Sequence, residues 1–446
     1  MLGTMAATSG CGWIIGLDEF TDAPPGGGGR GGGCTSPAEC PGGEHGTAAC
    51  EGGACGLLCD DGFADCDADV SGCESSTTTD KANCGGCGVT CSAYCVDGSC
   101  NDPVYIAVGY GRACAILKDG SLWCWGAVPG PVIIDGIQTQ PTRVELAGPA
   151  TQVAIGGGSG LVAHHTCAVL ADQTVQCWGG NNNGQLGLGH TSFTPTPTDV
   201  GLTNIQQISL GWYHTCAVEV GGRLLCWGYN DNGNVGDGTT TTALSPVEVA
   251  TSIAQVSAGG THTCAMTIDG HFRCWGLNSS GELGDGSQVT ALLPTPVAGL
   301  FNGVEIVSGG YHTCARTRVG AFCWGANYNG QLGLGSEMDQ HAPQPLTLAG
   351  INAIAAGRGY SGALVDGSVY TWGNNLSGQL GNGTAAGALS PTEIGLGQIK
   401  RLSIYWGSSC ALTEAGAVFC WGSNANGELG DGSTIAKSVP TAVLWP

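Results

Sequence analysis

The stretch that decides the fold runs from His165 to Gly189 and reads His165-TCAVLADQTVQCWGGNNNGQLGL-Gly189. Two short runs of apolar and β-branched residues flank a polar turn at Asp172, and a segment of asparagine and glycine follows them. Such runs between turn signals predict antiparallel strands joined in a hairpin.

The same pattern returns through the rest of the chain. A Trp-Gly pair closes the second strand of each unit, with the tryptophan at Trp125, Trp178, Trp227, Trp275, Trp324, Trp372 and Trp421. The spacing between them is 48 to 53 residues, and a polar stretch, a proline and a further short strand fill the remainder of a unit. Three or four short strands in a repeat of this length predict one blade of a β-propeller.

The motifs His-Thr-Cys-Ala, Cys-Trp-Gly and Asn-x-x-Gly-Gln-Leu-Gly resemble the repeats of the RCC1 family, over about 340 residues. Residues 181–189 and 327–335 are the best matches, whereas the first unit departs, with Ala127-Val-Pro-Gly-Pro in place of the asparagine motif. The resemblance implies an all-β fold with a seven-bladed β-propeller at residues 103–446. It also implies that strands near 105–108 and 442–445 pair to close the ring.

Composition and charge exclude some fold classes and some classes of binding partner. The chain has 446 residues, of which 81 are glycine and only 11% are charged, so long helices are not expected. With 13 basic against 35 acidic residues, the net charge is −22. Contacts to phosphates need clustered Lys and Arg, so we expect neither a nucleic-acid partner nor an anionic membrane surface.

Twelve cysteines recur in pairs that flank the hairpins. The pairs are Cys114 with Cys124, Cys167 with Cys177, Cys216 with Cys226, Cys264 with Cys274, Cys314 with Cys323, and Cys410 with Cys420. In the remaining unit, Gly362 and Thr371 replace both members together. Opposed residues on antiparallel strands are close enough for a disulfide, and joint loss is what a bonded pair would show. The alternative is a set of small buried thiols. Disulfides in this number predict an exported protein.

Residues 34–102 hold twelve further cysteines and no periodic apolar pattern, which predicts a small, disulfide-rich and mostly irregular domain. Its spacings resemble cysteine-rich segments of secreted bacterial lipoproteins. Zinc bound by Cys84, Cys87 and Cys91 is the alternative to disulfides there. The alternate acidic residues Asp65, Asp67, Asp69 and Glu74 could hold calcium, against the alternative of a solvated acidic loop.

Residues 1–33 are interpreted as the remnant of a lipoprotein signal followed by a Gly/Pro-rich tether. Thr8-Ser9-Gly10-Cys11 resembles a bacterial lipobox, which implies lipidation of Cys11, although Thr8 departs from the usual leucine. The short apolar stretch before Cys11 suggests that the true start lies upstream. A free thiol or an intermolecular disulfide at Cys11 is the alternative.

The histidines offer little sign of catalysis. His165, His214, His262 and His312 each precede Thr-Cys, and a residue that appears once per blade is expected to be structural, donating a hydrogen bond to a neighbouring loop backbone. The isolated histidines are expected at the surface: His45, His164, His190, His271 and His341. No carboxylate or nucleophile accompanies the repeated position.

Positions that vary between blades are the candidates for binding. They include the insertion at residues 156–163 and the aromatic residues Trp212, Tyr213, Tyr229, Tyr311, Tyr328, Tyr360, Tyr405 and Trp406. Aromatic side chains are frequent at binding hot spots, but some of these could simply fill the core.

The sequence therefore predicts a non-enzymatic binding protein, exported to the cell envelope or secreted, and lipid-anchored through Cys11. Its partner would be a protein or a glycan, with no cofactor beyond a possible calcium ion and with membrane contact only through the anchor. Secreted bacterial propellers of this repeat family that inhibit a β-lactamase are similar in mode. The alternatives are a guanine-nucleotide exchange factor for a small GTPase, a hydrolase or lyase acting in the propeller channel, and a tryptophan-based light sensor.

Overall fold

The computed structural model describes residues 35–39, 45–51, 54–64, 73, 75–128, 136–158 and 164–446. The chain divides into two compact units, Met1–Ser75 and Ser76–Pro446. Residues 76–102, which the sequence analysis placed with the cysteine-rich domain, thus belong to the same unit as the repeats. The predicted lipidation and calcium sites lie outside the described residues, namely Cys11, Asp65, Asp67, Asp69 and Glu74.

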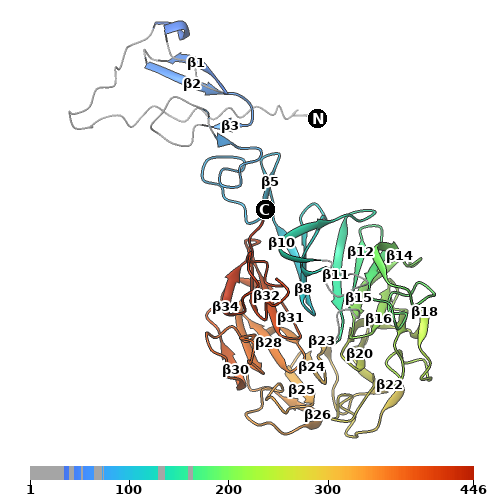
Figure 1. The fold of residues 1–446 in the computed structure, drawn as a ribbon. Coiled ribbons are helices and arrows are strands. Elements are labelled where there is room, and N and C mark those ends of the chain that lie inside the picture. Colours follow the sequence, from blue (N-terminus) through green and yellow to red (C-terminus); the bar gives the residue numbers. More distant parts are fainter. Residues whose placement is uncertain are drawn as a thin grey trace, which may run out of the picture. The chain divides into compact units, whose positions relative to one another are not determined.

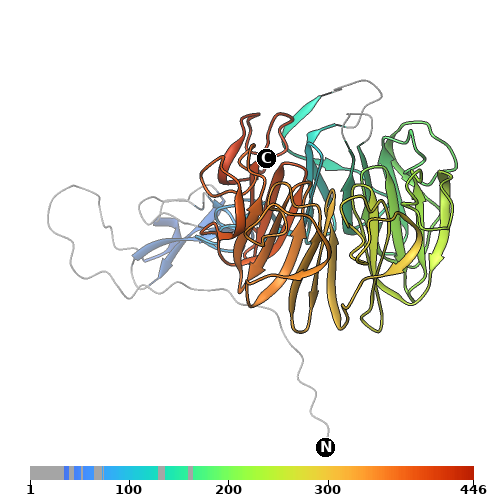
Figure 2. The same cartoon turned by 90° about the horizontal axis from the view of Figure 1, so that it is seen from below.

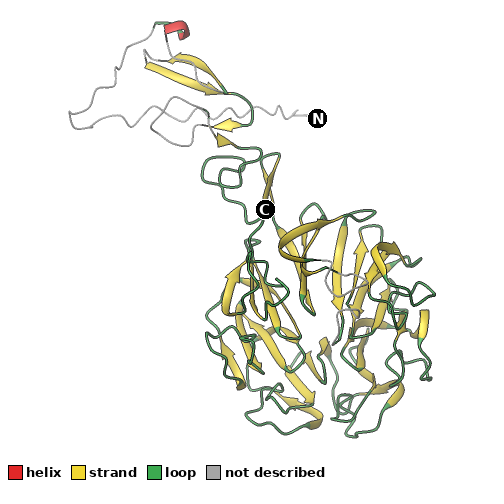
Figure 3. Cartoon of the chain, in the orientation of Figure 1, coloured by secondary structure: helices red, strands yellow, loops and turns green. Residues whose placement is uncertain are grey.

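The first unit is small. It contains the 3-10 helix η1 (Pro37–Glu39) and an antiparallel pair formed by β1 (Gly46–Glu51) and β2 (Ala54–Cys59), and it includes a disulfide between Cys59 and Cys73. The further strands of the N-terminal region are β3 (Phe63–Ala64) and β4 (Ser75–Ser76). Within the described residues η1 is the single helix, and the chain is otherwise strand and loop (Figure 3). No described helix is long and apolar enough to span a bilayer.

Seven four-stranded antiparallel sheets make up most of the second unit, and they follow one another in chain order around a ring (Figure 1). The first strand of each sheet contacts the first strands of its neighbours, so these strands surround the axis of the ring. The unit begins with the hairpin β5 (Tyr94–Val96) and β6 (Ser99–Asn101). The predicted seven-bladed propeller is confirmed.

Each blade consists of four consecutive strands. They are, for blade 1, β7 (Pro103–Gly109), β8 (Arg112–Leu117), β9 (Leu122–Ala127) and β10 (Ile137–Val144); for blade 2, β11 (Ala150–Gly156), β12 (His165–Leu170), β13 (Val175–Gly179) and β14 (Thr194–Asp199); for blade 3, β15 (Ile205–Leu210), β16 (His214–Glu219), β17 (Leu224–Gly228) and β18 (Ala243–Ala250); for blade 4, β19 (Ile253–Ala258), β20 (His262–Thr267), β21 (Phe272–Gly276) and β22 (Ala291–Pro296); for blade 5, β23 (Gly303–Ser308), β24 (His312–Thr317), β25 (Gly320–Gly325) and β26 (Gln340–Pro345); for blade 6, β27 (Ile351–Ala356), β28 (Tyr360–Val365), β29 (Ser368–Gly373) and β30 (Ala388–Glu393); and for blade 7, β31 (Ile399–Tyr405), β32 (Ser408–Thr413), β33 (Val418–Gly422) and β34 (Lys437–Ala442).

The ring does not close by pairing strands from the two ends of the chain, and that prediction was wrong. β10 pairs with β9 as the outer strand of blade 1, so this sheet is complete without a C-terminal strand. Blades 7 and 1 are instead neighbours joined through side chains (Figure 2). The Trp125 indole donates to the Glu428 carbonyl at 2.9 Å, and the Val108 amide donates to Ser403 Oγ at 3.0 Å.

Two contacts recur between neighbouring blades. The motif tryptophans are buried, and the Nε1 atom of most of them donates to a backbone carbonyl of the Gly-Gln-Leu-Gly segment in the preceding blade, as Trp227 does to Gln185 at 2.9 Å. The Nε2 atom of each repeated histidine lies 2.8 to 3.1 Å from a Thr or Ser hydroxyl of the next blade. The predicted histidine partner was a backbone group, whereas the actual partner is a side-chain hydroxyl.

The hydrogen bonds of the Thr or Ser hydroxyl determine which ring nitrogen of the histidine carries the proton. Thr263 Oγ1 donates its only proton to the Asn234 carbonyl at 2.8 Å, so it must accept from His214, whose Nε2 therefore carries the proton. Burial lowers the pKa of His214 to about 4 and that of His262 and His312 to about 3. These histidines are neutral structural donors at physiological pH.

All six cysteine pairs of the repeats are disulfides in the structure, and the alternative of buried free thiols does not hold. The Cα atoms within each pair are 4.0 to 4.1 Å apart, and the bonds join Cys114 to Cys124, Cys167 to Cys177, Cys216 to Cys226, Cys264 to Cys274, Cys314 to Cys323, and Cys410 to Cys420. The two members of each pair lie directly opposite each other on the two middle strands of a blade, where their side chains are buried. In blade 6, Gly362 and Thr371 face each other in the same register.

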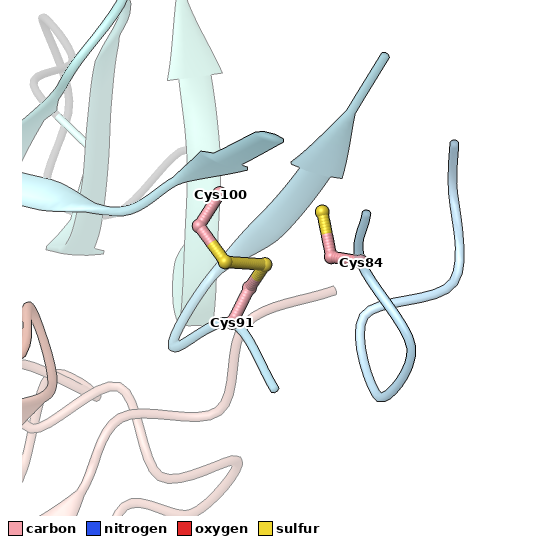
Figure 4. Close-up of side chains that lie close together, drawn as sticks. All are labelled: Cys84, Cys91 and Cys100. Atoms are coloured by element: carbon pink, nitrogen blue, oxygen red, sulfur yellow. A yellow bond between two sulfur atoms is a disulfide. The ribbon is translucent and has the colours of Figure 1, made fainter. Parts of the chain in front are cut away.

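The segment before blade 1 contains two further disulfides, one between Cys84 and Cys95 and one between Cys91 and Cys100. Three of their sulfur atoms, from Cys84, Cys91 and Cys100, lie within 4.8 Å of one another (Figure 4). Cys87 is also disulfide-bonded. Since zinc requires thiolates, the disulfide alternative is the one that holds for these cysteines.

Candidate functional site

The loops between the first and second strands of the blades lie around one end of the axis. The first strand of each blade, which lies next to the axis, ends in a glycine or tyrosine or is followed by a glycine. The residue directly after this glycine or tyrosine is not the same in all blades. At this position blades 1, 3, 6 and 7 have Tyr110, Trp212, Arg358 and Trp406, whereas blades 4 and 5 have glycine. Side chains at this position can therefore meet over the centre of the ring.

They form one cluster with Tyr311, the next residue of the blade 5 loop. We call it the axial cluster, and it consists of Tyr110, Trp212, Tyr311, Arg358 and Trp406. The Trp212 ring centroid lies 5.1 Å from that of Tyr311 and 5.6 Å from that of Trp406, and Tyr110 lies 4.7 Å from Trp406. Edge-to-face rings at 4.5–7 Å attract each other through their quadrupoles. Residues from five blades thus pack as one group.

Arg358 completes the cluster. Its Cζ atom lies 4.1 Å from the centre of the Trp406 ring and 6.0 Å from that of Trp212, within the range of cation–π attraction. The side chain of Arg358 is exposed, whereas Trp212 is only 9% exposed. The cluster therefore has the buried Trp212 at its base, half-buried rings around it and a cationic, solvent-facing top.

The two glycines of blades 4 and 5 make room for these side chains. A Cβ at Gly260 would lie 2.7 Å from Trp212 Cε2, and one at Gly310 would lie 2.8 Å from the Arg358 carbonyl oxygen. Trp406 also has a φ of 42°, in the left-handed region that bulky residues rarely adopt. Backbone strain of this kind is concentrated at functional sites.

Beneath the cluster little space remains. Trp212, Arg358, Tyr405 and Trp406, with the glycine backbone around them, enclose about 10 Å³, room for about one water molecule. Tyr405 reaches from blade 7 to the Gly157 carbonyl of blade 2, to which its hydroxyl donates at 3.1 Å. Burial raises the pKa of Tyr405 well above its usual range. Among the described residues, the space beneath the cluster is too small to enclose a substrate.

The predicted binding residues fall into three groups. Trp212, Tyr311 and Trp406 belong to the axial cluster, and Tyr405 lies directly beneath it. Tyr213, Tyr229 and Tyr328 lie on adjoining loops, with the Tyr213 and Tyr229 rings 6.1 Å apart and Tyr328 53% exposed. Tyr360 is fully buried in the place of a repeated histidine and donates to the Ser408 carbonyl at 2.7 Å, so it cannot contact a ligand.

The sequence analysis missed Tyr110, His164 and Arg358. His164 was expected at the surface but is 3% exposed and packs against Tyr110 with the ring centroids 4.7 Å apart; burial, with the nearby Arg112 charge, lowers its pKa to about 4. Aligning the residues that follow the inner-strand glycines would have identified Tyr110 and Arg358 as members of one variable position. Of the predicted insertion, residues 159–163 lie outside the described part of the chain.

At the opposite end of the inner strands, an open pocket of about 470 Å³ lies over blades 3 to 5. Its acid is Glu305, which accepts from Arg316 Nε at 3.2 Å and from the Ile354 amide at 3.2 Å. Burial raises the pKa of Glu305, and Arg316 opposes that rise. A carboxylate held in this way bridges two blades, and within this pocket it has no second acid beside it.

The comparisons with known proteins agree with this architecture. The model of the RCC1-like domain matches residues 138–445, and that of the regulator of chromosome condensation (RCC1) repeat matches residues 104–127. Yeast RCC1 (Prp20), solved with Kap60, is 22% identical, with a TM-score of 0.64 over 72% of this chain and 83% of that chain. Human WBSCR16 is 24% identical, with a TM-score of 0.62 over 73% of this chain and 94% of that chain. At these identities the two structures share the fold, while the family model spans more than half of the sequence. The chain therefore belongs to the RCC1-like domain family.

Proposed function

We propose that the protein is an exported, non-enzymatic binding protein that presents the axial cluster and its neighbouring tyrosines to a macromolecular partner. The cluster itself carries this proposal. It joins tyrosine, tryptophan and arginine, the residues most enriched at binding hot spots, on loops of a rigid ring. Every member of it occupies a position that varies between blades, so the repeated frame does not itself require these residues.

The disulfides support the part of the proposal that concerns export. Six of them lie in the repeats, and a cytosolic protein would keep such thiols reduced. This also counts against exchange activity on a cytosolic GTPase. Attachment to a membrane through a lipid on Cys11 remains part of the proposal and is tested by mass spectrometry of the N-terminal peptide from native membranes.

A channel-sited hydrolase or lyase has less support. The end of the axis beneath the cluster has room for about one water molecule, and the acid in the pocket at the other end is paired with an arginine. General acid–base catalysis on a glycan needs two carboxylates at a defined separation.

The experiment is a capture from envelope and extracellular fractions with three forms of the immobilised protein. The wild type is compared with the double variant Tyr311→Ala/Tyr328→Ala, which removes exposed aromatic surface at the cluster. Phe301→Ala is the matched control, because Phe301 is 60% exposed and precedes β23 at the end opposite Tyr311. We expect a partner that the wild type and the control retain and that the double variant releases. Equal retention by all three forms, or hydrolysis of a glycoside panel, would refute the proposal.

A further inference from the structure

Arg358 is an exposed cation without an acidic partner in the described part of the protein. Ion pairs there join Lys118, Arg143, Arg223, Arg316 and Lys437 to acidic side chains, and Arg358 is among the seven described cations that are in none of them. With 35 acidic and 13 basic residues, acidic partners are abundant in this chain. An arginine at the centre of one face without such a partner has its charge available to another molecule.

The aromatic base holds this arginine in place. The guanidinium group lies 4.1 Å from the centre of the Trp406 ring, and the loop that carries it lies over Gly310, where a side chain would clash. A guanidinium attracted to a ring through cation–π contact uses none of its N–H groups as donors to an oxygen, so they are free to bind other acceptors. These N–H groups form a fork that matches the two oxygens of a carboxylate.

Two tyrosines, Tyr311 and Tyr328, lie near the arginine. The pKa of Tyr328 is raised, first by burial and then by the neighbouring Tyr311, and the charge of Arg358 opposes this rise. The two tyrosines are thus within electrostatic reach of each other and of the guanidinium. Arginine and tyrosine side chains grouped in this way are enriched at protein–protein hot spots.

We infer that Arg358 is the anchor for a carboxylate of a partner protein, supplied by an aspartate or glutamate side chain on an exposed loop. This inference rests on the proposed function and names the chemistry that the partner must bring. The guanidinium, centred over the Trp406 ring, binds the carboxylate through two parallel N–H···O hydrogen bonds, with Tyr311 and Tyr328 beside it.

An acidic glycan could supply the same group, but the geometry favours a protein. Sugar rings stack on open aromatic faces, and here the face of Trp406 is covered by Arg358 while Trp212 is 9% exposed. The ring planes of Trp212 and Tyr311 stand at 90° to each other, which leaves no flat platform. The enclosed space of about 10 Å³ also cannot admit a sugar ring.

The test uses small probes and nuclear magnetic resonance. The probes are acetyl-Gly-Gly-Glu-Gly-Gly-amide, the same peptide with glutamine in place of glutamate, and oligogalacturonate. We expect the glutamate peptide to shift the indole Nε1–H signal of Trp406 and the Nε–H signal of Arg358, and the glutamine peptide to shift neither. Arg358→Gln should lower the affinity for the glutamate peptide by about tenfold or more. Arg358→Lys keeps the charge but loses the paired N–H donors of the guanidinium, and should lower this affinity by less.

Two results would overturn the inference. Equal shifts with the glutamate and glutamine peptides, or none with either, would show that the carboxylate is not bound. Tighter binding of oligogalacturonate than of the glutamate peptide would assign the site to an acidic glycan instead of a protein. Arg358 is exposed, so both variants should unfold at the wild-type denaturant midpoint, which separates loss of binding from loss of folding.

The captured partner separates this inference from the proposed function. If Arg358→Gln retains the partner while Tyr311→Ala/Tyr328→Ala releases it, the carboxylate anchor is wrong and the binding face stands. If both variants release the partner, both proposals are supported.

Discussion

Glu282 is a carboxylate in a place built for a neutral amide. It lies in the Gly-Glu-Leu-Gly segment after β21, where blades 2 and 5 have Gln185 and Gln331, and its side chain is fully buried. One carboxylate oxygen accepts from the Ser280 amide at 2.8 Å, as the amide oxygen of Gln331 accepts from Asn329 at 2.9 Å. The other oxygen is buried without a partner. Replacing Glu282 by glutamine should therefore keep the contact and remove the buried charge.

The effect depends on pH in a defined direction. Burial raises the pKa of Glu282 from 4.5 to about 6. Between these values the folded protein holds a proton that the unfolded chain has released, so the free energy of unfolding falls as the pH rises from 4.5 to 6 and is constant above that range. A shift of this size corresponds to about 2 kcal/mol. We expect Glu282→Gln to stabilise the protein by about this amount at pH 8 and to have little effect at pH 4.5.

Urea unfolding of the disulfide-intact protein at pH 4.5 and pH 8 measures this difference as a shift of the midpoint at constant slope. Gln331→Glu, in the next blade, is the reciprocal variant and should lose stability at pH 8 only. The same midpoint shift for Glu282→Gln at both pH values would refute the reasoning, because a packing change and not the charge would then be responsible.

Three other predictions concern a disulfide, the buried histidines and a hydrogen-bonded aspartate of the second unit. The double variant Cys167→Ala/Cys177→Ala should lose about 2–3 kcal/mol of unfolding free energy, and neither cysteine should be alkylated in the untreated wild type. Burial lowers the pKa of His214, His262 and His312, so their contribution to stability should be complete above pH 6.5 and fall by up to about 1.4 kcal/mol per pH unit for each of them below it; His262→Gln should make this acid limb of the stability curve shallower. Asp102 Oδ1 accepts from the Ser92 and Ala93 amides at 2.7 and 3.0 Å, so Asp102→Ala should lower stability by about 2 kcal/mol and raise hydrogen exchange at Ala93. A wild-type exchange rate at Ala93 in this variant would contradict the last prediction.

The parts of the fold that the sequence predicted are those that the chain repeats. Trp227 and His214 recur at fixed intervals, and a residue needed once per blade is recognised from its period without knowledge of its contacts. The paired loss of cysteines at Gly362 and Thr371 likewise indicated which residues face each other, and the structure places them opposite each other. Because the same contact recurs in several blades, the sequence alone shows which residues make it.

What the sequence could not predict depends on contacts that occur once. The distance between Tyr110 and Trp406 depends on how the ring closes, because the two residues are almost 300 positions apart in the chain. Ring closure itself was predicted wrongly, since only the three-dimensional pairing shows that β10 completes blade 1. Tyr360 was predicted to be a binding residue because the sequence does not show whether a tyrosine is buried or exposed.

Blade 6 shows how the repeated frame and the axial cluster depend on each other. It supplies Arg358, and it is also the blade in which Tyr360 replaces the histidine and Gly362 and Thr371 replace the disulfide. A Cβ at Gly362 would lie 2.8 Å from Leu402 of blade 7, so the space that the disulfide fills elsewhere is occupied by a neighbour. Tyr360 joins the blade to blade 7 by donating to the Ser408 carbonyl at 2.7 Å, and Thr371 donates to the Leu380 carbonyl of its own blade at 2.8 Å. Blade 6 is therefore joined to blade 7 by a contact that the other blades lack, next to the loop that places Arg358 on Trp406. The position of the Arg358 charge thus depends on the one blade that has no disulfide between its middle strands.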